Sequence, residues 1–389
     1  MAVIWEPTLD AEAAHWREVA RDLSERVFGP AAEEIDANAR YPHEHIPVLV
    51  ESGLAGLFVP KEFGGAGAPL VTTCAVMEEL AHGCATTASL FAAYILGSYP
   101  ILLAGTDDQK DAYLRAAATK GESVSFGLTE RNAGSDASAV ATTATPEGDK
   151  IRIRGEKWFI GNGGESRFYT VFARSETDAK GRARLTAYVV DKESEGVVID
   201  EWVDKMGIRG TKTSNIKLDT LVDPSARVGE PGRGIQLALG TLTVGRISTA
   251  AQCVGIGRAA YDEAASHAVE RRTFGSPIID NQGVSFPLAE IATELSAARM
   301  MTYEAARMFD AGQDTSVIGS MAKYYGSTVA HHAVNVGVQT FGGYGYCKPS
   351  KVERLYRDQR IFEIVEGTSE IQRLVIGRAI KDEKQGPRG

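Results

Sequence analysis

Residues 234–274, "GIQLALGTLTVGRISTAAQCVGIGRAAYDEAASHAVERRTF", form a proline-free stretch in which most residues are apolar or small. Proline breaks a helix interior, whereas a single glycine costs only about 1 kcal/mol relative to alanine. The stretch therefore predicts one long helix in spite of its glycines. Two further helical patterns follow it, over 284–312 and 315–343. We expect a four-helix-bundle domain at the C-terminus, over residues 233–389.

The chain before residue 122 is also predicted to be helical. In 11–28, "AEAAHWREVARDLSERVF", the apolar residues recur at helical spacing. The segment 106–121, "TDDQKDAYLRAAATKG", opens with acidic residues and closes on Gly121, which are typical start and stop signals. We expect an N-terminal α-helical domain over residues 1–122.

Between these helical parts the hydrophobic period changes. Short β-rich stretches separated by turn residues occupy 123–130, 150–162, 168–174, 184–191 and 215–221. "IRIR" within the second stretch alternates apolar and basic residues, as a half-exposed strand does. We expect a central β-barrel or sandwich domain over residues 123–232, and the fold class is α+β.

Composition narrows the class of protein. The 389 residues carry a net charge of −9, which disfavours nucleic acid or an anionic membrane as the main partner. The four cysteines are scattered, which suits a reducing compartment. The N-terminus lacks the pattern of a signal peptide, and no uninterrupted apolar run is long enough to span a membrane. We expect a soluble, cytoplasmic protein.

The common motifs of catalysis are missing. The sequence contains no GxxxxGK[ST], no GxGxxG in a βαβ context, no HExxH and no GxSxG. The sequence therefore does not indicate a Walker loop, a Rossmann-type dinucleotide-binding fold, a zinc protease or a serine hydrolase. No metal site is expected.

Three stretches carry a chemical signal. In 126–138, "FGLTERNAGSDAS", a strand runs into a polar turn that can bind an anion or the rim of a heteroaromatic ring. In 156–164, "EKWFIGNGG", two adjacent aromatic residues precede glycines, and on a regular strand they face opposite sides. An ordinary loop and a core aromatic pair remain the alternatives for these two stretches.

The third stretch, 361–373, "IFEIVEGTSEIQR", places Glu366 between an apolar run and a Gly-Thr-Ser turn. Ser369 and Gln372 have the spacing of a capping box, which predicts a helix start near Glu370. Gly367 permits close approach of the backbone. Burial raises the pKa of a carboxyl group, so Glu366 is either a base in a dry pocket or a solvated turn residue.

These stretches resemble the signatures of the acyl-CoA dehydrogenase family of flavoproteins. "LTERNAGSD" is similar to the first signature, and "QTFGGYGY", "RLYRDQRI" and "IVEGTSEIQRLVIGR" together are similar to the second. "RRTFG" and "GLFVPKEFGGAG" match two further segments. The resemblance runs from about residue 10 to residue 380, and it agrees with the α-β-α order.

The resemblance implies oxidation of an acyl-CoA thioester to trans-2-enoyl-CoA with FAD as cofactor. Glu366 is then the base that removes the α-proton, while hydride passes to flavin N5. Some relatives carry the base on the long helix instead, at the position of Gly245, which has no side chain to serve. Arg246 is implied to lie near the thioester, where Ser135, Tyr94 and Gly367 complete the expected substrate contacts.

The resemblance also assigns the FAD contacts. Those expected from one subunit are Phe126, Leu128, Thr129, Gly134, Ser135, Phe159, Gly161, Thr368 and Glu370. Those expected from the neighbouring subunit are Arg271, Phe274, Gln282, Gln339 and Gly343. A shared FAD implies at least a dimer, and the resemblance implies a homotetramer that passes electrons to an electron-transfer flavoprotein.

Two departures from the family pattern concern the flavin edge. Phe159 and Gly161 stand where a tryptophan and a hydroxyl residue are common, and Arg131 replaces a usual proline. Alternatives on the same fold are an acyl-CoA oxidase, a flavin monooxygenase and a dehydrogenase of acyl-carrier-protein thioesters, and a flavin-free binding module is a further alternative. The acyl group is not specified by the sequence, although Tyr94 and Ala92 are candidates to shape its pocket.

Overall fold

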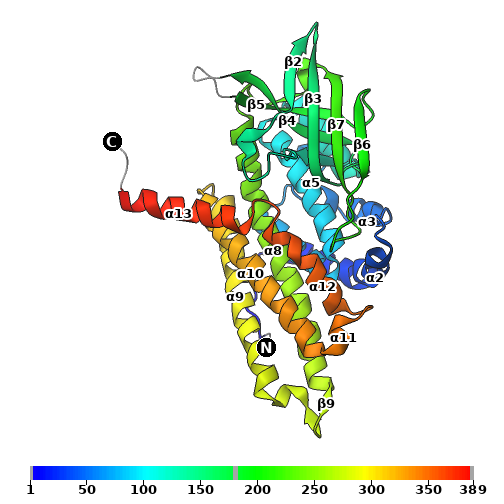
Figure 1. Cartoon of the computed structure of the whole chain (residues 1–389), viewed down its shortest axis with the longest axis vertical. Helices are drawn as coiled ribbons and strands as arrows, with labels where there is room; N and C mark the ends of the chain where they lie inside the picture. The colour runs from blue at the N-terminus through cyan, green and yellow to red at the C-terminus, as the bar shows by residue number, and fades with distance from the viewer. Residues whose placement is uncertain (1–2, 178–182, 386–389) are drawn as a thin grey trace.

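The computed structural model describes residues 3–177 and 183–385, and it has the expected order of helices, strands and helices. Figure 1 shows strands β2 to β7 gathered at one end of the molecule, with the long helices extending away from them. The α+β prediction of a helical N-terminal part, a central sheet and a helical C-terminal part is confirmed.

The N-terminal part is helical up to Lys120. The chain forms a π-helical turn at Ser24–Phe28 and another at Lys110–Leu114. Gly121 adopts a positive φ angle where its helix ends, as the stop signal predicted, and Gly53 does so after α3. The helices are α1 (Ala11–Leu23), α2 (Gly29–Asn38), α3 (His45–Glu51), α4 (Leu70–Gly83), α5 (Ala85–Ala104), α6 (Asp107–Gln109) and α7 (Arg115–Lys120).

The central part is one sheet with the strand order β6-β7-β3-β2-β4-β5-β8, and β1 pairs in parallel with β4. Strands β2 and β4 share a single paired position, so the sheet consists of two halves joined there. β2, β6 and β8 were not foreseen, because β2 is short and mostly polar, β6 does not alternate and β8 has only two residues. The strands are β1 (Val124–Gly127), β2 (Thr143–Glu147), β3 (Lys150–Gly161), β4 (Phe168–Thr177), β5 (Ala183–Asp191), β6 (Val197–Trp202), β7 (Thr213–Val222) and β8 (Arg227–Val228).

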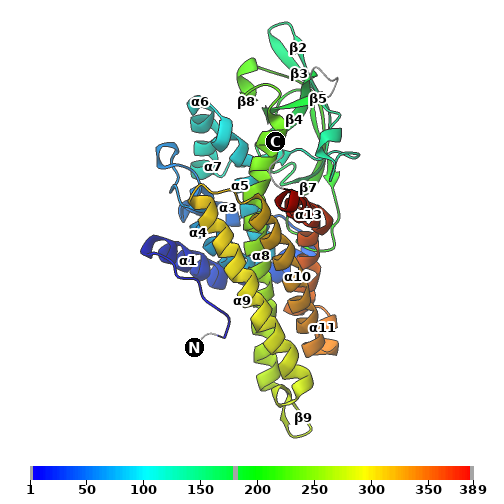
Figure 2. The same cartoon turned by 90° about the vertical axis from the view of Figure 1, so that its left-hand side faces the viewer.

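The predicted long helix is α8 (Gly234–Glu270), which continues unbroken for 37 residues. Figures 1 and 2 both show it running from the strands to the far end of the bundle. It packs against α4 and α5 on one side and against α9 and α10 on the other. The remaining elements are the strands β9 (Arg272–Thr273) and β10 (Ser276–Pro277) and the helices α9 (Gln282–Asp310), α10 (Ser316–Phe341), α11 (Gly343–Tyr346), α12 (Lys351–Gln359) and α13 (Ser369–Gln385).

Among the described residues, helix α5 alone has the length and apolar composition that a membrane span requires. Such a helix was not expected from the sequence. Its most apolar window is 61% buried inside the protein, and it packs against α8, α4 and β1. These contacts identify α5 as a core helix.

Candidate active site

Glu366 lies in the short turn between a 3₁₀ segment, Arg360–Glu363, and α13, and it has a φ angle of 56°. The next residue, Gly367, has a φ of 88°, so two left-handed residues follow each other. A non-glycine residue pays roughly 1 kcal/mol or more for this conformation. The turn is partly exposed, but the carboxylate atom Oε2 is buried and has no hydrogen-bond partner among the described residues.

The carboxylate of Glu366 occupies space that Gly245 leaves free on α8. A Cβ atom added to Gly245 would lie 2.5 Å from Oε2 and 3.0 Å from Cδ of Glu366. It would also lie 3.2 Å from Cδ1 of Leu96 on α5. The helix position at which some relatives carry their base is therefore filled, in this chain, by the side chain of Glu366.

The electrostatic surroundings of Glu366 suit a base. Burial raises its pKa to about 7, and the positive charges of Lys323 and Arg246 act against that rise. Arg246 is buried on α8, where Nη1 lies 3.4 Å from Ser320 Oγ and Nε has no partner among the described residues. A carboxyl group poised near neutrality can accept a proton from a weak carbon acid and release it again.

The turn is held differently from the predicted capping box. Thr368 caps α13, since its Oγ1 accepts from the amide of Ile371 at 3.4 Å, and the helix begins at Ser369. Gln372 does not reach back as a capping residue would. Its Nε2 donates to the carbonyl oxygens of Glu366 and Gly367, at 3.1 and 2.8 Å. The spacing matched a capping box, but the side-chain amide stabilises the left-handed turn instead.

Lys323 on α10 was missed in the sequence. Its Nζ donates to the Gly367 carbonyl oxygen at 2.8 Å, and the residue is fully buried. A signal was present, because Lys323 is the one Asp, Glu, Lys or Arg residue between 315 and 347. A lone charge inside an apolar helix is costly unless it is paired, which points to a structural or functional partner.

The loop after β1 and strand β3, which both carry predicted flavin contacts, lie next to each other. The amide of Trp158 donates to the Thr129 carbonyl at 2.9 Å. Behind this contact, the buried Lys157 donates to Glu130 Oε1 at 2.8 Å and to the Phe172 carbonyl at 2.7 Å. This buried ion pair, which the sequence analysis did not foresee, fixes the polar turn against the sheet.

The two aromatic residues of β3 do not follow the regular alternation of side chains between the two faces of a sheet. The pairing of β3 with β7 shifts between Lys157 and Ile160, so Trp158 and Phe159 together face one residue, Asn215. Phe159 has a φ of 55° and is 60% exposed. The guanidinium of Arg131 lies 5.4 Å from the centre of the Trp158 ring. Arg131 therefore covers Trp158 and leaves Phe159 open.

The other predicted contacts on this side vary in exposure. Phe126 is half-buried against Phe172 and Leu128 is buried, whereas Gly134, Ser135 and Gly161 are exposed. No atom lies within 4 Å of a Cβ placed on Gly134 or Gly161, so both glycines border open space.

Tyr94 does not face Glu366. It is buried, and its hydroxyl donates to the Gly121 carbonyl at 2.7 Å, at the end of α7. On α5 it is Leu96 that contacts the space around Glu366 and Gly245. The expectation that Tyr94 shortens the acyl pocket is not supported, since its side chain is part of the packing between helices.

The residues expected to contact FAD from a neighbouring subunit are far from Glu366 in the same chain. Figures 1 and 2 show β9 at the end of the bundle opposite to the main sheet. Phe274 follows β9, has a φ of 50° and is fully exposed. Arg271 and Gln282 flank it, and Gln339 and Gly343 lie near the start of α11. One chain therefore presents the predicted contacts as two separate groups.

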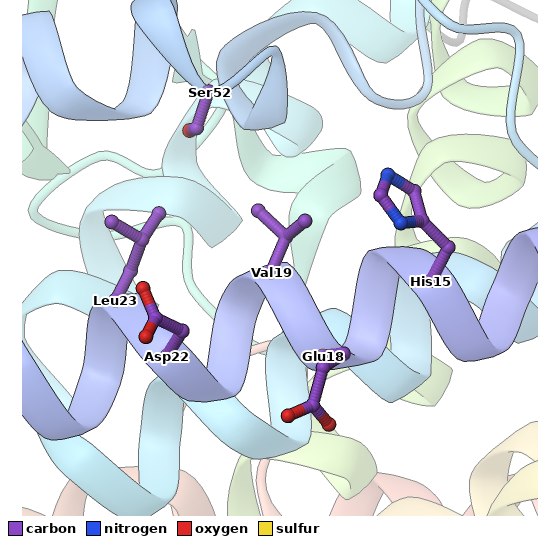
Figure 3. A pocket seen from close by; sticks show the side chains of 6 residues that line it. All are labelled: His15, Glu18, Val19, Asp22, Leu23 and Ser52. Carbon is purple, nitrogen blue, oxygen red and sulfur yellow. The ribbon is translucent and has the colours of Figure 1, made fainter.

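A surface hollow elsewhere takes no part in this site. It lies between α1 and the end of α3, and Figure 3 shows the side chains that line it. These are His15, Glu18, Val19, Asp22, Leu23 and Ser52. None of them was predicted to have a role, and the hollow lies outside the groups described above.

A buried carboxylate of raised pKa, on a left-handed turn beside a cleared helix position, is the arrangement that a general base requires. Three family models identify the family: acyl-CoA dehydrogenase N-terminal domain over residues 10–121, middle domain over 125–221 and C-terminal domain over 232–381. The chain belongs to the acyl-CoA dehydrogenase family, FAD-dependent oxidoreductases that act on a CH–CH bond of an acyl-CoA.

Known proteins are similar in sequence or structure to nearly the whole chain. The 3-(aryl)acrylate reductase of Clostridium sporogenes is 42% identical, with 92% of this chain and 96% of the relative covered. Subunit CarC of the caffeyl-CoA reductase–Etf complex of Acetobacterium woodii is 37% identical, with 92% and 96% covered. The butyryl-CoA dehydrogenase structure from Megasphaera elsdenii is 34% identical, with a TM-score of 0.94 and with 97% and 100% covered.

Proposed function

We propose that the chain oxidises an acyl-CoA thioester to the trans-2-enoyl-CoA and that Glu366 removes the α-proton. One observation carries this proposal: the buried, unpartnered Oε2 of Glu366 lies where Gly245 provides space and where burial raises the pKa to about 7. The amide of Glu366 is proposed to donate to the thioester oxygen, where negative charge develops. Bound FAD supplies the acceptor for the hydride that leaves the β-carbon.

The residues present fit FAD. Phe159 offers an exposed ring beside Gly161, and Gly134 leaves room for close approach of a flat or charged group. Phe126, Leu128 and Thr129 border the same region, and Thr368 and Glu370 are proposed to contact the pyrophosphate or ribose at the start of α13. Free amides at a helix start favour an anion, which supports that placement.

The second group of FAD contacts is proposed to serve a neighbouring copy. These residues lie on or near β9 and α11, at the other end of the bundle: Arg271, Phe274, Gln282, Gln339 and Gly343. A complete FAD site would therefore need two copies of the chain. We propose a homotetramer. An electron-transfer flavoprotein is the proposed acceptor, because CarC of Acetobacterium woodii belongs to a complex named for one. A cytoplasmic location is part of the same proposal.

The reverse direction is a second candidate. Two relatives that match 92% of this chain are named as reductases, of a 3-(aryl)acrylate and of caffeyl-CoA. In that direction Glu366 would return a proton to the α-carbon while hydride arrives at the β-carbon. The two candidates use one site and differ in the redox partner and in the acyl group.

The test is anaerobic reduction of bound flavin by a series of acyl-CoA thioesters that includes short, branched and 3-arylpropanoyl groups. We expect Glu366→Gln to keep its yellow FAD and to lose reduction by every thioester. Glu294→Gln, a matched change on the outside of the bundle, is the control. Reduction at the wild-type rate in Glu366→Gln would show that another group is the base.

Two further measurements separate the alternatives. Peroxide formed under air at the rate of turnover identifies an oxidase, whereas reduction of an electron-transfer flavoprotein identifies a dehydrogenase. Reoxidation of reduced enzyme by a 3-arylacrylyl-CoA identifies a reductase. A protein that takes up no FAD would exclude all of these functions.

A further inference from the structure

Lys323 is a buried cation to which the proposed reaction gives no part. Its side chain lies inside the bundle with no exposed surface. Within 3–177 and 183–385, the one hydrogen bond of Nζ is to the Gly367 carbonyl, and no ion pair joins it to a carboxylate. Desolvating an ammonium group costs several kcal/mol. Among the described residues, the hydrogen bond to the Gly367 carbonyl is the interaction that offsets part of this desolvation cost.

That carbonyl belongs to the turn that aims Glu366. Residues 366 and 367 both have positive φ, which only glycine adopts freely. The Gly367 carbonyl accepts from both Lys323 and Gln372, and the Glu366 carbonyl accepts from Gln372. These three hydrogen bonds fix the peptide planes on the C-terminal side of Glu366. They therefore determine where its side chain points, which is into the space beside Gly245.

Charge is the second link between Lys323 and Glu366. Burial lowers the pKa of Lys323 to about 8, and Cys253 and Glu366 act against that fall. Lys323 is in turn the first of the two cations that hold down the pKa of Glu366, ahead of Arg246. The other charged or titratable groups that face this pair are Glu363, at the end of the 3₁₀ segment that follows α12, and Glu370 at the start of α13.

We propose that Lys323 is a positioning residue for Glu366: it fixes the left-handed turn through the Gly367 carbonyl and keeps the carboxylate ionised by its charge. This inference rests on the proposed role of Glu366 as the base. Lys323 itself touches neither substrate nor FAD in this scheme. Its two effects, on geometry and on charge, are separable by substitution.

The experiment measures the pH dependence of anaerobic flavin reduction in three variants. Lys323→Met removes the donor and the charge, so we expect a lower plateau and an acid limb moved to higher pH by about one unit, the lower end of what an opposite charge does to a carboxyl group. Lys323→Arg keeps the charge and a donor, so its acid limb stays in place. Gln372→Met loosens the same carbonyls without changing charge, and it lowers the plateau alone.

A second readout does not depend on turnover. The infrared carboxyl band of Glu366, assigned by difference from Glu366→Gln, titrates at higher pH in Lys323→Met than in wild type. If Lys323→Met does not fold into a yellow protein, Lys323→Arg decides, and an acid limb shifted by a unit in that variant overturns the inference. An unshifted limb in a folded Lys323→Met overturns it as well.

Different results would refute the proposed function and the proposed role of Lys323. A wild-type protein whose flavin no acyl-CoA reduces and no enoyl-CoA reoxidises refutes the proposed function, and the role of Lys323 falls with it. An active wild type with an unshifted Lys323→Met refutes the role of Lys323 alone.

Discussion

Replacing Gly245 by alanine tests the site with a single added atom. The new Cβ would lie 2.5 Å from Oε2 of Glu366, closer than such atoms approach in real structures, and 3.2 Å from Leu96 Cδ1. Hydrogen bonds from Lys323 and Gln372 hold the backbone of the Glu366 turn, so the carboxylate can yield only by rotating its side chain out of the space beside Gly245. We expect loss of activity from a change that is otherwise favourable in a helix.

The magnitude follows from the cost of overpacking, about 1–3 kcal/mol for one methyl group in a filled space. If that cost falls on the reacting geometry, the rate constant drops by about 5- to 150-fold, because 1.36 kcal/mol corresponds to a factor of ten. The assay is the rapid anaerobic reduction of bound flavin by the best acyl-CoA. The spectrum before mixing shows whether FAD is retained.

Gly240→Ala is the matched control. It lies on the same helix, and its Cβ would meet Leu103 Cδ1 at an ordinary 3.6 Å. Both substitutions remove a helical glycine, which stabilises a helix by roughly 0.5–1 kcal/mol. We expect Gly240→Ala to reduce its flavin at the wild-type rate. Equal rates in Gly245→Ala and wild type, or equal losses in both variants, would refute the proposed placement of Glu366.

Three further predictions concern pH, the buried ion pair and the shared FAD. A base must be ionised and burial raises the pKa of Glu366 to about 7, so flavin reduction by wild type should rise with pH through about 7; a flat profile down to about pH 5 would contradict this. Lys157→Met leaves Glu130 buried without its cation and should cost about 3–5 kcal/mol in urea unfolding, part of which Glu130→Gln restores; an unchanged unfolding midpoint would contradict it. Arg271→Ala should release FAD on dilution, seen as fluorescence of free flavin, while the adjacent Arg272→Ala retains it; equal retention would argue against a pyrophosphate contact.

Local rules were enough to predict much of this fold. The stop at Gly121 and the continuity of α8 follow from backbone freedom and the absence of proline, and both are properties of the sequence alone. The β-bulge at Trp158 and Phe159 does not follow from alternation, because it depends on how β3 pairs with β7. Tyr94 illustrates the same limit: the residue types on a helix do not reveal which face meets the site.

Glu366 was singled out from local sequence, but its partners were not. Lys323 lies 43 residues earlier in the chain, and it meets the Gly367 carbonyl only because α10 packs beside α13. Gln372 had the right spacing for a cap, and its true acceptors became clear only with the left-handed turn in place. Contacts made by long-range packing have no local signature beyond an unexplained charge.

The geometry finally explains why this chain has a carboxylate at 366 and nothing at 245. Because a Cβ on Gly245 already collides with Oε2 of Glu366, the two positions compete for one volume beside Leu96. A base on α8 would need no backbone strain, whereas Glu366 pays for its left-handed φ and needs Gln372 and Lys323 to hold the turn. In return, the proposed base and its own backbone amide belong to one turn. A thioester bound there can meet the proton acceptor and the proposed oxyanion donor in a single fixed relation, which a base on a separate helix would not provide.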